Sequence, residues 1–149
     1  MIRFPLMVAM MMLVACANLQ SVSRAAENAN CVDVRDSASL RFEGTLELRT
    51  FAGPPNYEDV RKGDTPEPTY ILRLDNPTCA FGDEFLDPKQ KIDRLHISAS
   101  GMGLRGLVGQ RIAITGSEAF GAHTGHHHAP LVMMVKSVAK ASERTRRPK

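Results

Sequence analysis

The sequence predicts an all-β domain that closes into a small barrel, and two observations support this fold class. Apolar and polar residues alternate along residues 40–49, as in a strand with one buried face. Four shorter segments with strand composition follow, at residues 70–75, 92–97, 111–115 and 131–138. Four glycines at positions 101–109 limit the segment between the third and fourth strands to one short helix.

The first two predicted strands have distinct local features. Gly44 lies on the apolar side of the first strand, where we expect a bulge or a sharp bend. The second strand is expected to end at Asn76-Pro77, because proline cannot donate a hydrogen bond to a neighbouring strand. Five strands with a helix between the third and fourth are the order of an OB-fold, a five-stranded Greek-key barrel. An open five-stranded sheet or an SH3-like barrel would use the same strands.

Length, charge and composition restrict the classes of function. The chain has 149 residues, which is enough for one small domain, and we place that domain at residues 31–139. Aromatic residues make up 5% of the chain and tryptophan is absent, which argues against base stacking on nucleic acid.

The last ten residues, 140–149, carry five basic side chains and are predicted to be a disordered basic tail, either solvated or in contact with anionic lipid or a partner. Without this tail and Arg3 the formal charge is about −2, so no basic face for nucleic acid is expected.

The N-terminal segment predicts export. One basic residue precedes an uncharged apolar run at residues 4–15, which has the length of a signal-peptide core and is too short to span a membrane. Leu13-Val14-Ala15-Cys16 resembles a bacterial lipobox, so residues 1–16 would form the signal peptide with its lipobox. Residues 17–30 would then be a polar tether. The expected location is the periplasm, with a lipid anchor at Cys16 in the outer membrane. Ordinary cleavage around Ala15-Cys16-Ala17, or after Ser23-Arg24-Ala25, is the alternative.

The three cysteines agree with export. If Cys16 is lipidated or removed, Cys31 and Cys79 remain as one pair, and an oxidising compartment makes a disulfide between them the expected state. Closing a loop of this length stabilises a domain by about 4 kcal/mol in the chain-entropy model.

Two connections carry the candidate binding residues. The long connection at residues 50–69 holds two prolines followed by Asn56, Tyr57, Glu58 and Asp59, and it is predicted either to bind a ligand or partner or to cover the barrel end. In an OB-fold it lies beside the connection between the last two strands, so the two loops are expected to form one rim.

The second connection holds four of the five histidines of the chain: His123, His126, His127 and His128. Neutral imidazoles bind Zn, Cu or Ni, and Gly125 lets the loop turn so that His123 meets one or two of the other three. Glu58 or Asp59 would supply a further ligand from the neighbouring loop. The alternative is structural, with the imidazoles hydrogen-bonded to the backbone of a tight loop. His96 is interpreted as an ordinary strand residue.

These motifs resemble an uncharacterised family of small exported bacterial domains. Its members carry a Gly-Pro-Pro-Asn-Tyr-Glu loop, a cysteine after the second strand and a closing His-Thr-Gly-His-His-His-x-Pro motif. Here these are residues 53–58, Cys79 and residues 123–130. Gly121 and Ala129 stand where the family often has histidine and threonine, which weakens a scheme with the full histidine set as a metal site. Some relatives are joined to lysozyme-inhibitor-like domains, which implies an envelope inhibitor or immunity protein.

No motif for catalysis accompanies these loops. The sequence holds no Gly-x-Ser-x-Gly elbow, no phosphate-binding glycine loop and no His-Glu-x-x-His. The prediction is therefore a non-catalytic periplasmic binding protein, an inhibitor or immunity-type partner of a secreted enzyme or toxin. An envelope metal-binding protein that uses the histidine loop is the alternative.

The lipid anchor is directly testable. Cys16→Ser should abolish lipid attachment and release the protein into the soluble periplasm, because the thiol is the acceptor of the lipid. Mass spectrometry of the mature chain checks this, and a mature N-terminus beyond Cys16 would rule out the anchor.

Overall fold

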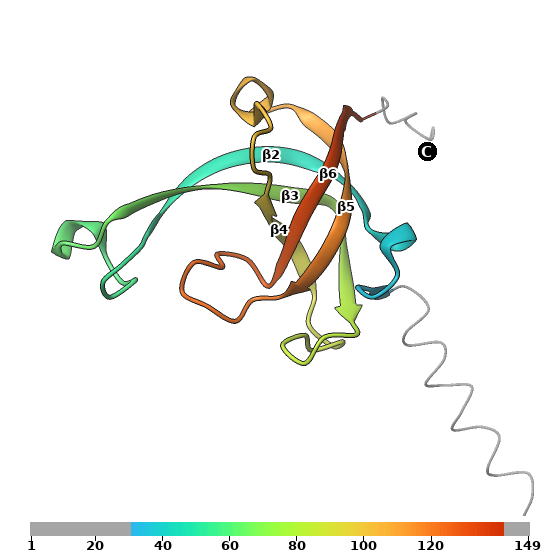
Figure 1. Cartoon of the computed structure of the whole chain (residues 1–149), viewed down its shortest axis with the longest axis horizontal. Helices are drawn as coiled ribbons and strands as arrows, with labels where there is room; N and C mark the ends of the chain where they lie inside the picture. The colour runs from blue at the N-terminus through green and yellow to red at the C-terminus, as the bar shows by residue number, and fades with distance from the viewer. Residues whose placement is uncertain (1–30, 142–149) are drawn as a thin grey trace, which may run out of the picture. The chain divides into compact units, whose positions relative to one another are not determined.

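The computed structural model describes residues 31–141, and these residues form a closed barrel of five long strands (Figure 1). The elements in chain order are the strands β1 (Cys31–Asp33), β2 (Arg41–Ala52), β3 (Pro66–Phe81), β4 (Ile92–Ser98), β5 (Arg111–Gly121) and β6 (Leu131–Lys140), and the 3-10 helices η1 (Ser37–Ser39), η2 (Val60–Lys62) and η3 (Leu104–Leu107). The predicted signal peptide with Cys16, the tether and residues 142–149 of the tail lie outside the described residues. Among residues 31–141, no helix has the length and apolar character needed to cross a membrane.

The pairing of the strands is that of an OB-fold. β2 pairs with β3 and β5, and β3 also pairs with β4, all antiparallel. β4 then runs parallel to β6, and β6 pairs antiparallel with β5, which closes the ring. η3 lies between β4 and β5, so the predicted barrel and its short helix are confirmed. β1 was not predicted; it lies beside β3 at the edge of the sheet.

The core follows the alternation along the strands. Inward-facing apolar residues from all five long strands are buried in one cluster: Phe42, Leu46, Leu72, Leu74, Leu95, Ile97, Ile112, Ile114, Leu131, Met133 and Val135. The neighbours of these residues in each strand point outward, as a period of two requires. Leu48 was predicted to lie on the buried face, but it is 38% exposed. It lies beyond Thr45, the last residue of β2 that pairs with β5.

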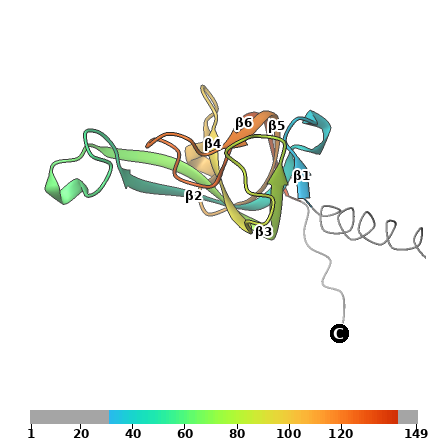
Figure 2. The ribbon, with the colours of Figure 1, turned by 90° about the horizontal axis from the view of Figure 1, so that it is seen from below.

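Several strands are longer than predicted. β3 does not end at Asn76-Pro77: its pairing with β4 is interrupted between Arg73 and Thr78 by a bulge and then resumes. Pro77 fits there because its missing N–H is not required where the ladder is broken. The connection predicted for residues 50–69 is shorter, because β2 and β3 stay paired up to Ala52 and Pro66. The two strands form a ribbon that projects from the barrel in both views (Figure 1 and Figure 2). β5 and β6 also extend beyond their predicted ends.

Both cysteines of the described residues, Cys31 and Cys79, are disulfide-bonded, as predicted. Cys31 begins β1, and Cys79 lies near the end of β3. Next to them, the backbone N–H of Val34 donates to the carbonyl oxygen of Phe81 at 3.0 Å. The N-terminal edge of the domain is therefore fixed to β3.

Gly44 is required where β2 serves both halves of the barrel. It pairs with Leu74 of β3 and with Ile112 of β5. A Cβ atom built on Gly44 would lie inside van der Waals contact with the backbone carbonyl of Arg73. No register shift marks a bulge at Gly44 in either pairing. The structure shows at this glycine a close approach of two backbones, which a side chain would prevent.

Gly44→Ala should destabilise the domain by about 3 kcal/mol, because backbone cannot move aside as a flexible side chain can. Gly106→Ala is the matched control, since a Cβ there meets nothing within 4 Å, and its effect should stay within about 1 kcal/mol. Urea denaturation of both variants measures the difference. Equal stability of the two variants would contradict the role given to Gly44.

Candidate functional site

The two predicted loops, residues 53–65 and 122–130, contact each other beside the barrel. The Oη atom of Tyr57 and the Nε2 atom of His126 are 2.9 Å apart, and their rings meet edge to face. Gly125 lies under the Tyr57 ring, where an added Cβ would come within 2.8 Å of a ring carbon. The loops are thus joined by one hydrogen bond and by a contact that only glycine allows.

The first loop is organised around the Asp64 carboxylate, which is only 3% exposed. Its oxygens accept hydrogen bonds from the backbone N–H groups of Asn56, Glu58 and Asp59 at 2.8–2.9 Å, and from the Asn56 side chain at 3.2 Å. The backbone bonds from Glu58, Asp59 and Asn56 hold the pKa of Asp64 below its usual value. A charged carboxylate therefore replaces the partners that a regular strand would give these N–H groups.

Tyr57 has an unusual backbone. Its φ is +60°, and within residues 31–141 Tyr57 is the one residue other than glycine whose φ is positive. Its backbone N–H donates to the Gly53 carbonyl, and its side chain is 38% exposed. A left-handed conformation is unfavourable for a bulky residue and persists only where its surroundings enforce it. The Asp64 carboxylate and the Gly125 contact supply that enforcement.

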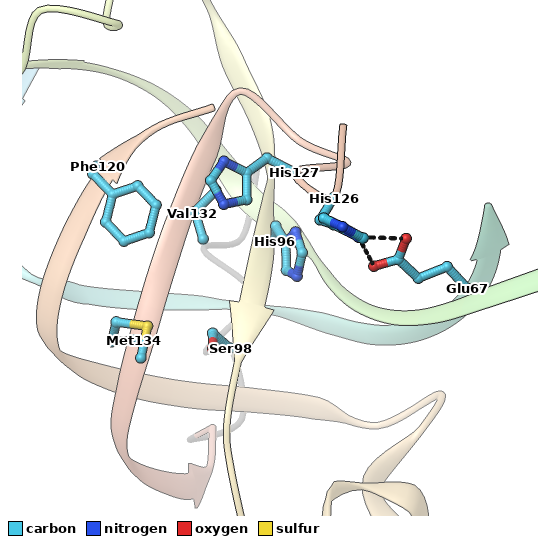
Figure 3. Close-up of a pocket in the computed structure, with 8 residues that line it drawn as sticks. All are labelled: Glu67, His96, Ser98, Phe120, His126, His127, Val132 and Met134. Carbon is cyan, nitrogen blue, oxygen red and sulfur yellow. Dashed lines mark hydrogen bonds and ion pairs between the residues drawn. The ribbon is translucent and has the colours of Figure 1, made fainter. Parts of the chain in front are cut away.

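His126 connects Tyr57 to Glu67 at the start of β3. The Nδ1 atom of His126 lies 2.9 and 3.0 Å from the two carboxylate oxygens of Glu67 (Figure 3). The Nδ1–H therefore donates to Glu67; a neutral ring then accepts the Tyr57 hydroxyl at Nε2, whereas a protonated ring donates to the Tyr57 oxygen from Nε2–H. Burial by itself would raise the pKa of Glu67, but the hydrogen bond from His126 and the charges of His126 and His128 outweigh it and lower the pKa.

His128 and His96 form a stack with Phe51 on the outer face of the sheet. The ring centroids of Phe51 and His128 are 4.2 Å apart, and those of His128 and His96 are 5.9 Å apart, with nearly parallel planes in both pairs. The backbone N–H of His128 donates to Nδ1 of His96 at 3.3 Å. Burial, followed by the charges of His128 and His127, lowers the pKa of His96 to about 4. His96 is therefore neutral at neutral pH.

His123 and His127 complete the cluster. The backbone N–H of His123 donates to Nδ1 of His127 at 3.1 Å, and the Nδ1 atom of His123 lies 2.9 Å from the Gly121 carbonyl. Their rings also contact Phe85 and Phe120. Burial, followed by the charges of His123, His126 and His128, lowers the pKa of His127. These imidazoles thus make the backbone hydrogen bonds that the structural interpretation of the loop expects.

The other predicted residues have different partners. Asn56 donates to Asp64, and Glu58 is exposed. Asp59 caps η2, and its carboxylate accepts hydrogen bonds from Arg61. Within residues 31–141, no group of three or more His, Cys, Asp or Glu residues is arranged to hold a metal ion. Binding of Zn, Cu or Ni by the histidine loop remains a prediction from the sequence.

Sequence reasoning missed the aromatic partners of the histidines, and it missed His96, Glu67 and Asp64. His96 was interpreted as an ordinary strand residue, but it lies under His128, because its place in β4 opposite Val132 of β6 puts it on the outer face. Glu67 precedes the strand that was predicted, and Asp64 was given no role. The partner of Glu67, His126, comes from a distant segment, so no local pattern indicates it. The partners of Asp64 lie in its own loop, but the fold of that loop is not visible in the sequence.

The comparisons with known proteins give a match to a family model. Residues 97–139 match the family model of a domain of unknown function, DUF4431. This segment runs from the end of β4 through the histidine loop into β6. The resemblance to an uncharacterised domain is thereby supported. No match was found among curated proteins or among solved structures.

The neutral state of His96 predicts a pH dependence of stability. The pKa of His96 is about 4 in the folded protein and about 6.5 in an unfolded chain, so the unfolded state binds more protons between these values. The stability linked to His96 is complete above pH 6.5 and is lost as the pH falls towards 4.

His96→Asn removes the titrating ring but keeps an acceptor, because its Oδ1 can still accept from the His128 N–H. The loss of unfolding free energy between pH 7 and pH 4 should be smaller in this variant by about 1–2 kcal/mol. This range allows for the partial exposure of the ring. Urea denaturation at several pH values measures this. An unchanged slope of stability against pH in the variant would contradict the assignment.

Proposed function

We propose that the protein is a non-catalytic binding protein of the bacterial envelope, an inhibitor or immunity-type partner of a secreted enzyme or toxin. The observation that carries the proposal is the fixed, exposed ring of Tyr57. Tyrosine is among the residues that contribute most to protein interfaces, because its large ring loses little conformational freedom on binding.

Several contacts fix this ring before any partner arrives. Asp64 holds the backbone on both sides of Tyr57, Gly125 packs against the ring, and the hydroxyl bonds to His126. Ordering the ring in advance lowers the entropic cost of association. The loop is thus suited to present an anchor side chain to the surface of another protein.

The hydrogen bonds from Glu67 through His126 to Tyr57 also allow a catalytic interpretation, because a carboxylate, an imidazole and a hydroxyl in this order activate nucleophiles in hydrolases. Here the hydroxyl belongs to the side chain that joins the two loops. In the binding protein that we propose, these hydrogen bonds hold the Tyr57 ring in place. Removing the hydroxyl while keeping the ring separates the two interpretations.

The envelope location is supported by the apolar N-terminal run and the lipobox at Cys16. The disulfide-bonded Cys31 and Cys79 agree with an oxidising compartment. An anchored protein of this kind would meet enzymes or toxins that enter the envelope.

The test captures the partner in envelope extract by photo-crosslinking from position 58, an exposed residue beside the intact Tyr57, and then measures its affinity by calorimetry. Tyr57→Ala should weaken binding by about 30-fold or more, because it removes the anchor. Tyr57→Phe should weaken it by less than about tenfold, because it loses only one hydrogen bond. Leu48→Ala, an exposed apolar residue on β2, is the control and should bind as the wild type does.

Two results would contradict the proposal. Full binding by Tyr57→Ala would show that the ring is not the anchor. Equal losses in Tyr57→Ala and Tyr57→Phe would show that the hydroxyl, and with it the chain through His126 to Glu67, is what function requires.

A further inference from the structure

A pocket of about 350 Å³ lies on the outer face of the barrel, next to the histidine loop. Its walls come from β3, β4, β5, β6 and the loop, through Glu67, His96, Ser98, Phe120, His126, His127, Val132 and Met134 (Figure 3). His96 and Ser98 of β4 are paired with Val132 and Met134 of β6, so the floor is the parallel strand pair itself. The volume is at the lower end of the range for small-ligand sites.

Two histidines of the pocket have a defined tautomer. Nδ1 of His96 accepts the backbone N–H of His128, and Nδ1 of His127 accepts the backbone N–H of His123. A nitrogen that accepts a hydrogen bond carries no proton, so each neutral ring carries its proton on Nε2. The pocket thus has two neutral imidazole N–H donors whose tautomers are set by the backbone of the loop.

The remaining lining combines one acceptor with an apolar surface. Figure 3 shows the Glu67 carboxylate with His126 on one side, and Phe120 and Met134 on the other. Val132 is buried on the floor, and Ser98 adds a hydroxyl. No lysine or arginine is among the lining residues, and the His126 ring is already paired with Glu67, so an anionic ligand would meet the carboxylate without an unpaired cation.

From this chemistry we infer that the pocket binds a neutral saccharide ring. Sugar hydroxyls both donate and accept, which suits Glu67 on one side and the Nε2–H groups of His96 and His127 on the other. The C–H face of a sugar suits the apolar surface of Phe120 and Met134. This site goes beyond the proposed partner surface, because Tyr57 does not line the pocket.

The test is a titration of ¹⁵N-labelled protein followed by NMR. The two neutral probes are maltotriose, which carries hydroxyl groups only, and tri-N-acetylchitotriose, which also carries acetamido groups. Trigalacturonate, which carries carboxylates, is the anionic probe. We expect shifts of the amide signals of residues 96–98 and 132–134 with at least one neutral probe, at a dissociation constant of about 1 mM or below. Trigalacturonate should cause no such shifts.

Two variants locate the binding. Met134→Arg fills the pocket and should weaken sugar binding tenfold or more. Position 134 is 36% exposed and is paired with Glu118, so the new charge is not buried. Leu48→Arg is the matched control, an exposed apolar residue outside the pocket, and should bind as the wild type does. His96→Asn keeps the bond to the His128 N–H but lacks the Nε2–H donor, and should weaken binding about fivefold.

The inference is overturned if neither neutral sugar shifts these signals, if trigalacturonate binds as well as they do, or if Met134→Arg binds normally. These outcomes are distinct from failure of the partner surface. Tyr57→Ala tests partner binding, whereas the pocket is tested by variants at positions 96 and 134.

Discussion

The barrel depends on one close approach of two backbones, at Gly44. At this residue β2 pairs with β3 on one side and with β5 on the other, so a single strand holds both halves of the barrel together. A side chain there would meet the Arg73 carbonyl. Because the two loops extend from the ends of these same strands, the position of the candidate site depends on this contact as well.

Outside the barrel, the buried carboxylate of Asp64 organises the loop at residues 53–65. The Asp64 carboxylate satisfies three backbone N–H groups of an irregular loop, and these bonds hold Tyr57 in its left-handed conformation. Such a conformation is expected where function requires a fixed side chain. One buried acidic residue therefore determines how the Tyr57 ring is presented at the surface.

The histidine cluster shows how one loop can cover the outside of a barrel. Four imidazoles make hydrogen bonds to the backbone or to Glu67, and His96 and His127 stay neutral because they are partly buried. This arrangement gives the loop a defined structure and includes His96 and His127 in the lining of the pocket on β4 and β6. The same residue types would suit a metal, but their geometry in residues 31–141 is that of a hydrogen-bonded network.

The sequence by itself predicted the five long strands, their order, the helix η3 and the disulfide, because alternation, glycine content and cysteine count can be read without knowing which residues meet. It did not predict β1 or the full lengths of β3, β5 and β6. It also indicated the two loops and Tyr57. Only the tertiary structure decided which side chains meet. Glu67 and His96 acquired their roles because strand pairing places residues from distant segments on the same outer face, and the register that does this is not visible in any local pattern. Asp64 acquired its role because its own loop folds back, so that three backbone N–H groups of residues 56–59 meet its carboxylate.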